Sequence, residues 1–194
     1  MTISDLGEIT ESSLPMIVFS DQTSGFMEFL IKFRTGGNYN HVMLCVEPGQ
    51  FVSQGNTYSK VPFERYMKKN SRLKFVSILG ITPAGRQAIV DCVNDKLALP
   101  WYLKLYDWVG ILGQITGLNF INNPKLEYCS EDAPNILKKA VKRCPQGFPA
   151  PLDGIIKNIP AHTSPQKFNE YLHDFHGTCF PVYMKWEGDD ANDI

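Results

Sequence analysis

The sequence lacks the features of a secreted or membrane-spanning chain. Met1 to Glu8 contain neither a basic region nor an apolar run, so we expect no signal peptide. The closest approach to a transmembrane segment, residues 105–120, is interrupted by Asp107, Gln114 and Asn119, so we expect no integral membrane segment. We therefore expect synthesis in a cytoplasm. If the protein acts outside the cytoplasm, it would have to be delivered as part of a phage virion or as an injected effector. The proteins that assemble the virion or the effector would then be its partners.

The chain also lacks a strong net charge, a disulfide framework and a metal-binding motif. Its formal net charge is −1, so there is no electrostatic reason to expect nucleic acid as a partner. The cysteines number 5, an odd count without paired spacing, and we expect reduced thiols. His173, His176 and Cys179 have a spacing that a metal could use, but a fourth ligand is missing. There is no Gly-rich phosphate loop. We expect no cofactor and no metal.

What the chain does have is the composition of one globular domain. Hydrophobic residues make up 43% and charged residues 20%, which is enough apolar side chain to bury a core. We expect a single domain over residues 1–186, with its core at about 15–143 and a C-terminal extension over 144–186 that begins as a surface loop rich in proline and glycine. Residues 187–194 are acidic and predict a disordered tail.

Apolar patterning predicts an α+β fold, in which helices pack on a meandering antiparallel sheet. The strands are expected over residues 15–20, 41–46, 51–54, 72–79 and 179–186. The helices are expected over residues 24–35, 83–99, 101–117, 129–143 and 165–173. The helix over 101–117 is aromatic and rich in glycine, which predicts that it packs in the core. Residues 60–63 are expected to lead into a short helix or a loop.

Cys129 stands at the start of one of these predicted helices. Ser130, Glu131 and Asp132 favour a helix's first turn, and Pro134 is tolerated there because it has no N–H to donate. Unpaired backbone N–H groups at a helix start stabilise a thiolate, so Cys129 is a candidate nucleophile. The alternative is a small buried cysteine without a reaction to perform.

His41 stands at the start of a predicted strand. The preceding Gly36, Gly37 and Asn38 indicate a turn that launches it. A histidine at the mouth of a strand can face a cleft and act as a general base. The alternative is a surface histidine that caps a turn. Only a fold that brings strand and helix together can make His41 a partner of Cys129.

Three short motifs in this order resemble a known family: Asn40-His41-Val42, Tyr106-Asp107 and Tyr128-Cys129-Ser130-Glu131. The family is the circularly permuted branch of the NlpC-like, papain-fold cysteine hydrolases, the YiiX-like group, which is related to lecithin:retinol acyltransferase. The resemblance covers residues 15 to 141. In ordinary papain-like enzymes the cysteine helix precedes the histidine strand, and permutation implies the reversed order seen here. The resemblance implies a permuted papain-like fold in which Cys129 and His41 act together.

The resemblance also implies a polar third residue on the strand after the histidine's strand. Ser53 and Gln54 stand there, where many permuted relatives carry an acid or a second histidine, so this chain departs from the family. We prefer Gln54, whose amide oxygen can accept from an imidazole N–H, and place Ser53 second. The backbone N–H of Cys129 and the hydroxyl of Tyr106 are candidate oxyanion donors. Tyr106 could equally be one more core aromatic.

The expected function is a cysteine hydrolase that cleaves an amide bond through a thioester intermediate. The family's common substrate class, the peptide part of peptidoglycan, is the substrate that the resemblance implies. A lipid ester or amide is the alternative, because the aromatic, Gly-rich residues 101–120 could line an acyl pocket. A third hypothesis is a binding or structural module that retains the fold without catalysis, and the departure at the third position is its main support.

Overall fold

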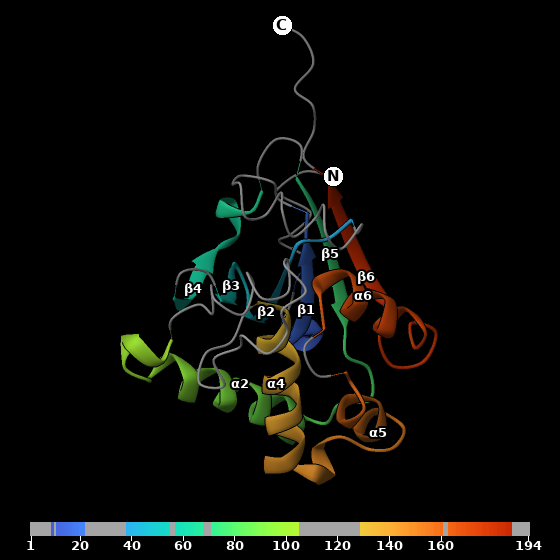
Figure 1. Ribbon diagram of the computed structural model, residues 1–194. Helices are drawn as coiled ribbons and strands as arrows, with labels where there is room; N and C mark the ends of the chain where they lie inside the picture. Colours follow the sequence, from blue (N-terminus) through green and yellow to red (C-terminus); the bar gives the residue numbers. More distant parts are fainter. Residues whose placement is uncertain are drawn as a thin grey trace, which may run out of the picture.

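An antiparallel sheet carries the α-helices on one of its faces (Figure 1), which makes the chain an α+β protein as expected. This computed structural model describes residues 9, 11–21, 38–54, 57–67, 71–104, 129–160 and 163–187. The strands are β1 (Met16–Ser20), β2 (His41–Glu47), β3 (Gln50–Gln54), β4 (Tyr58–Pro62), β5 (Arg72–Ser77) and β6 (Val182–Glu187). The α-helices are α2 (Pro83–Leu97), α4 (Cys129–Arg143), α5 (Leu152–Lys157) and α6 (Pro165–His173). The short 3-10 helices are η2 (Glu11–Ser13), η3 (Phe63–Arg65), η4 (Trp101–Leu103) and η5 (Pro145–Gly147).

The strands follow the order β4-β3-β2-β1-β5-β6, and each neighbouring pair is antiparallel. A tight turn joins β2 to β3, and Gly49 in that turn has a φ of +79°, which glycine adopts without steric cost. The predicted strands in this part of the sheet are confirmed. Strand β4 was not predicted. Lys60 and Pro62 of β4 are typical of an edge strand, and β4 stands at the edge of the sheet. These two residues interrupt the apolar alternation by which a strand is recognised in the sequence.

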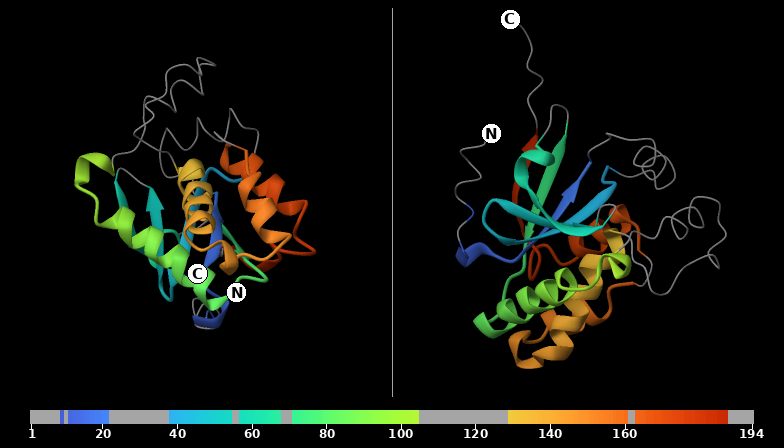
Figure 2. Two further views of the ribbon diagram at one scale, coloured as in Figure 1. Left: turned by 90° about the horizontal axis from the view of Figure 1, so that it is seen from below. Right: turned by 90° about the vertical axis from the view of Figure 1, so that its left-hand side faces the viewer.

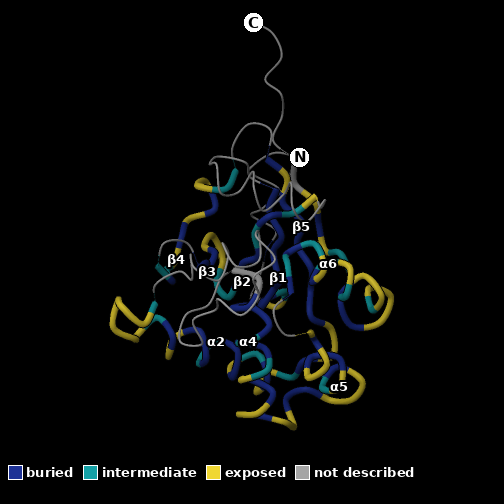
Figure 3. Tube along the Cα trace, in the orientation of Figure 1, coloured by how far each residue is buried: buried dark blue, intermediate teal, exposed yellow. Residues whose placement is uncertain are grey.

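The two faces of the sheet are covered by different apolar clusters, because successive strand residues point to opposite sides. On the helix side, Val42 and Leu44 of β2 pack with Ile136 and Leu137 of α4. On the other face, side chains of β1, β2, β3 and β5 pack against the segment around η3. This second cluster includes Met43, Cys45, Phe51, Phe63 and Phe75. Figure 3 shows the central strands buried along most of their length. Both faces therefore contribute to the core.

The predicted starts of three helices are confirmed. Thr82 and Ser164 cap α2 and α6, since their hydroxyls accept from the backbone N–H groups of Gly85 and Lys167 at 3.2 and 3.3 Å. Each of these helices then begins with a proline, whose missing N–H costs nothing there. The third helix, α4, begins at Cys129.

Two predictions for residues 101–154 are wrong where the structure tests them. At the start of the core helix expected over 101–117, the structure has the short 3-10 helix η4 with Trp101 68% exposed, and residues 105–117 lie outside the described residues. The expected surface loop after Cys144 contains η5 and α5, and Ile156 is fully buried. Pro151 stands in the N-cap position of α5 rather than breaking structure. The helix expected over 24–35 lies outside the described residues.

The C-terminal extension belongs to the same fold as the rest of the chain. Strand β6 pairs with β5 at one edge of the sheet, and α5 packs against α4. The strand begins at Val182, later than the predicted 179, because Pro181 has no N–H for the ladder and offers only its carbonyl, to Ser77, at 3.0 Å. In the part of the chain that is described, none of the helices has the length and apolar character needed to cross a bilayer.

Candidate active site

The two leading candidates begin two elements that pack against each other, β2 and α4. Helix α4 begins at Cys129, packs against β2 and runs away from the sheet, and its first turn is at the end where β2 begins (Figures 1 and 2). His41 is the first residue of β2 and stands opposite Ser20, the last residue of β1. Strand β2 and helix α4, which are far apart in the sequence, thus pack against each other.

The imidazole of His41 shares a sheet face with Met43 and Cys45, which is the face opposite α4, because residues at a spacing of two point to one side. Its Nε2 atom lies 2.7 Å from Oγ of Ser53 and 3.2 Å from the hydroxyl oxygen of Tyr66. Within the described part of the chain, Nδ1 has no hydrogen bond. The ring is therefore held at Nε2.

Ser53 and Tyr66 complete a closed polar triangle with His41. The oxygen of Ser53 lies 3.0 Å from the hydroxyl oxygen of Tyr66, and Ser53 is 1% exposed. The phenol ring of Tyr66 stacks on the imidazole with a centroid separation of 5.6 Å and an interplanar angle of 9°. The partners that hold Nε2 are neutral hydroxyls.

Burial lowers the pKa of the His41 imidazole from 6.5 to about 4. The physical cause is desolvation, which disfavours the charged imidazolium, although the residue as a whole keeps part of its surface exposed. At neutral pH the ring is therefore uncharged. A neutral imidazole has one nitrogen with a free lone pair, which is what proton abstraction requires.

Gln54, the preferred third residue, has a different environment from the imidazole. Its Nε2 donates to the backbone carbonyl of Lys104 at 2.8 Å, and its buried Oε1 has no hydrogen-bond partner among the described residues. Ser53, the second choice, makes the contact with His41. Neighbouring strand residues point to opposite faces, so the pairing of Met43 with Ser53 decides which of the two faces the histidine.

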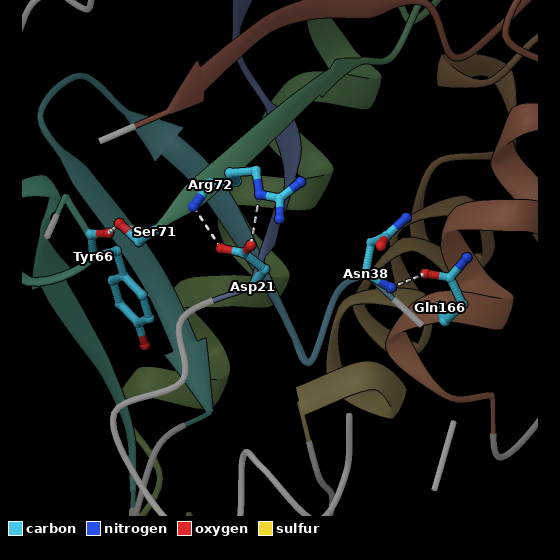
Figure 4. A network of polar contacts seen from close by, with 6 residues as sticks. All are labelled: Asp21, Asn38, Tyr66, Ser71, Arg72 and Gln166. Atoms are coloured by element: carbon cyan, nitrogen blue, oxygen red, sulfur yellow. Dashed lines mark hydrogen bonds and ion pairs between the residues drawn. The ribbon is translucent and has the colours of Figure 1, made fainter. Parts of the chain in front are cut away.

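Tyr66 is a member of the triangle that the sequence did not reveal. It follows η3, where its backbone N–H donates to the carbonyl of Phe63 at 2.9 Å. The hydroxyl of Ser71 donates to its backbone carbonyl at 2.8 Å (Figure 4). Tyr66 lies outside the strands and α-helices, so no periodic pattern in the sequence predicts where its side chain points. The sequence showed only that an aromatic residue follows β4. Tyr106, the candidate oxyanion donor, lies outside the described residues, and its role stays a prediction.

Polar contacts fasten the strand ends next to His41 (Figure 4). The carboxylate of Asp21, just after β1, pairs with Arg72 at the start of β5, with Nε and Oδ2 3.0 Å apart. The backbone N–H of Asn38, just before β2, donates to the side chain of Gln166 on α6 at 3.0 Å. These contacts hold the end of β1, which lies beside His41, and the segment just before β2.

A buried ion pair fastens the first turns of α4. Lys96 of α2 pairs with Asp132, and both residues are buried. The ammonium of Lys96 also lies 4.5 Å from the ring centroid of Tyr58, a cation–π contact. Asp132 was expected to favour the helix start by its charge. In the structure it also ties that start to α2.

The histidines near the C-terminus make a pair but not a larger cluster. The rings of His173 and His176 stack in parallel with centroids 5.1 Å apart. Among the residues that the structure describes, no group of three or more potential metal ligands comes together.

No known protein family model matches the sequence, and no curated protein matches it either.

Proposed function

We propose that this chain is a cysteine hydrolase with a circularly permuted papain-like fold, in which Cys129 is the nucleophile and His41 the general base. The observation that carries the proposal is the 2.7 Å hydrogen bond between Nε2 of His41 and Oγ of Ser53. A partner on Nε2 orients the ring and leaves Nδ1 for proton transfer. The proposal is further supported by the position of Cys129 at the start of α4, where backbone N–H groups favour a thiolate.

The reaction that these residues would perform is hydrolysis of an amide. Nδ1 of His41 takes the thiol proton, and the thiolate attacks the carbonyl carbon while the carbonyl π electrons move to oxygen. The oxyanion collapses, the C–N bond breaks, and His41 gives its proton to the leaving amine. Water then attacks the thioester with His41 as base, which yields the carboxylic acid and restores the thiol.

The low pKa of His41 affects how the ring gives and takes its proton. The neutral hydroxyls beside it do little to stabilise an imidazolium, so the protonated ring readily gives its proton to a leaving amine. A thiolate beside the ring would favour the imidazolium and raise its pKa. The ion pair between thiolate and imidazolium is therefore the arrangement in which His41 keeps a proton.

The geometry sets a condition on this mechanism. The imidazole lies on the face opposite α4, and His41 is the first residue of β2. The thiol of Cys129 must therefore approach the ring around the end of β2 and not through the sheet. A separation well beyond hydrogen-bond reach in an inhibitor-bound crystal structure would contradict the mechanism.

The substrate we propose is a peptide amide of peptidoglycan, following the family resemblance, with delivery in a phage particle or as an effector. A second candidate substrate, a lipid acyl ester or amide, is favoured by the exposed apolar residues in and around η4. Their exposed fractions are 39% for Leu99, 68% for Trp101, 55% for Tyr102 and 39% for Leu103. Exposed apolar side chains of this kind suit contact with an acyl chain or a lipid surface.

The test compares single variants on both substrates. Wild type should release new amino groups from purified peptidoglycan fragments, or fatty acid from a long-chain acyl ester, and the substrate that responds identifies the class. Cys129→Ser and His41→Ala should each lose this turnover, while Cys92→Ser, a buried thiol on α2, should keep it. If wild type turns over neither substrate across the pH range, the chain is better explained as a binding module.

A further inference from the structure

We propose that Tyr66 is a positioning residue for His41, whose hydroxyl acts with that of Ser53 to hold the imidazole in the tautomer that carries its hydrogen on Nε2. The choice of tautomer rests on the proposed function, whereas the restraint that Tyr66 places on the imidazole does not. Nothing in the family resemblance points to Tyr66.

The position of the phenol supports this role. Its hydroxyl oxygen lies 3.2 Å from Nε2 of His41 and 3.0 Å from Oγ of Ser53. Its ring lies nearly parallel to the imidazole, at 9°, and meets Phe51 edge-on at 71°. The hydroxyl fixes one ring atom and the stacking fixes the ring plane. Two neutral contacts thus restrain both the direction and the tilt of the histidine.

The hydrogen bonds of the triangle can run in two directions, and each direction goes with one tautomer of the imidazole. As an acceptor, Nε2 takes the hydrogen of Ser53, which can in turn accept from Tyr66, and the hydrogen of the ring then lies on Nδ1. As a donor, Nε2–H can give its hydrogen to Ser53 at the shorter distance of 2.7 Å, and Ser53 can pass its own hydrogen to Tyr66. Both directions occupy the two hydroxyls, and we assign the second because it leaves the lone pair on Nδ1, where the proposed reaction needs it.

The backbone around Tyr66 keeps the phenol in place. Its N–H and carbonyl are bonded to Phe63 and Ser71 at 2.9 and 2.8 Å. The segment from η3 to β5 therefore brings the hydroxyl to the imidazole, although no part of it belongs to the strands that carry His41 and Ser53. A tyrosine held in this way can position a base without contacting substrate.

The experiment uses Tyr66→Phe, which keeps the ring and removes the hydroxyl. Tyr171→Phe is the matched control, because it removes a half-buried hydroxyl that donates to Ile155 at 2.8 Å and has no contact with His41. The first readout is the ¹⁵N NMR spectrum of His41 at neutral pH, which reports the tautomer. The second is a pH–rate profile with kcat and KM separated.

Tyr66→Phe should lower the share of the Nε2–H tautomer and reduce kcat about three- to tenfold with little change in KM, the size expected for one lost hydrogen bond. Ser53→Ala should act in the same direction, and the double variant should lose less than the two single losses combined, because both hydroxyls serve the same nitrogen. Tyr171→Phe should change neither readout.

The outcomes separate this inference from the proposed function. A tautomer shift in Tyr66→Phe supports the inference even where wild type turns over no substrate, and in that case the hydrolase proposal fails alone. An unchanged ¹⁵N spectrum in both Tyr66→Phe and Ser53→Ala overturns the inference, whatever the activity. A folded state is checked by thermal unfolding, and Ser53→Ala carries the test if Tyr66→Phe does not fold.

Discussion

The two faces of the sheet hold their residues by different interactions, apolar contacts and an ion pair on one face and neutral hydrogen bonds on the other. On the helix side, large apolar contacts and the buried pair of Lys96 with Asp132 hold the start of α4 in place. On the opposite face, the hydroxyls of Ser53 and Tyr66 hold the imidazole of His41 at the edge of an aromatic cluster. One face positions a helix start with charge, and the other positions a titrating ring with neutral groups.

This difference explains why the histidine is kept uncharged. A carboxylate next to His41 would favour the imidazolium, whereas neutral hydroxyls leave desolvation as the main influence on its pKa. The ion pair of Lys96 and Asp132 lies on the helix side, and the carboxylate of Asp21 is paired with Arg72. The comparison predicts that variants on the helix side change mainly stability, and that variants on the other face change mainly the pH dependence.

The largest effect is expected from Asp132→Ala. It leaves the ammonium of Lys96 buried without its carboxylate, which typically costs about 3 to 5 kcal/mol of unfolding free energy. Urea unfolding at neutral pH measures this. Asp153→Ala is the control, because it removes an exposed pair with Lys157 that contributes at most about 1 kcal/mol. Equal losses in both variants would show that the buried pair does not fasten α4.

His41→Gln should change how stability depends on pH. The folded pKa of about 4 lies below the ordinary 6.5, so as pH falls the unfolded chain binds this proton first. The lowered pKa of His41 therefore adds to the free energy of unfolding at neutral pH relative to acid pH. This contribution is complete above pH 6.5 and is lost as pH falls through 4, and it amounts to about 3 kcal/mol as an upper limit. The measurement is urea unfolding of wild type and variant at several pH values from 7 to about 4.

Wild type should lose more stability than His41→Gln over this range, and the excess is the contribution of the buried histidine. His176→Gln, at an exposed histidine, should behave as wild type does. If wild type and His41→Gln lose stability in parallel, desolvation does not control the pKa of His41.

Gly85→Ala should destabilise the helix side by about 1 to 3 kcal/mol, the range for overpacked sites. A Cβ at Gly85 would lie 2.3 Å from the backbone oxygen of Gly147, and a backbone atom cannot turn aside as a flexible side chain can. Gly154→Ala in α5 meets nothing within 4 Å and should be neutral or slightly stabilising through helix propensity. Thermal unfolding of the two variants gives the comparison, and a stable Gly85→Ala would mean that α2 and η5 can separate without cost.

Features that depend on local sequence were predicted well. Thr82-Pro83 and Ser164-Pro165 begin helices because a capping hydroxyl and a proline act within one turn. Cys129 begins α4 for a related reason, since the residues after it favour a first turn. His41 begins β2 as expected, because a turn followed by an apolar run needs no distant partner to be recognised.

Features that depend on register and on distant segments were decided only by the tertiary structure. The pairing of β2 with β3 turns Ser53 and not Gln54 toward His41, and a shift of one residue would have reversed this choice. The hydroxyl of Tyr66 belongs to a segment outside β2 and β3, so no periodic pattern in the sequence predicts its contact with His41. The sequence by itself determined where strand and helix begin, through short-range backbone preferences. Which side chains meet at the imidazole followed from strand register and long-range packing, which are settled only when the whole sheet assembles.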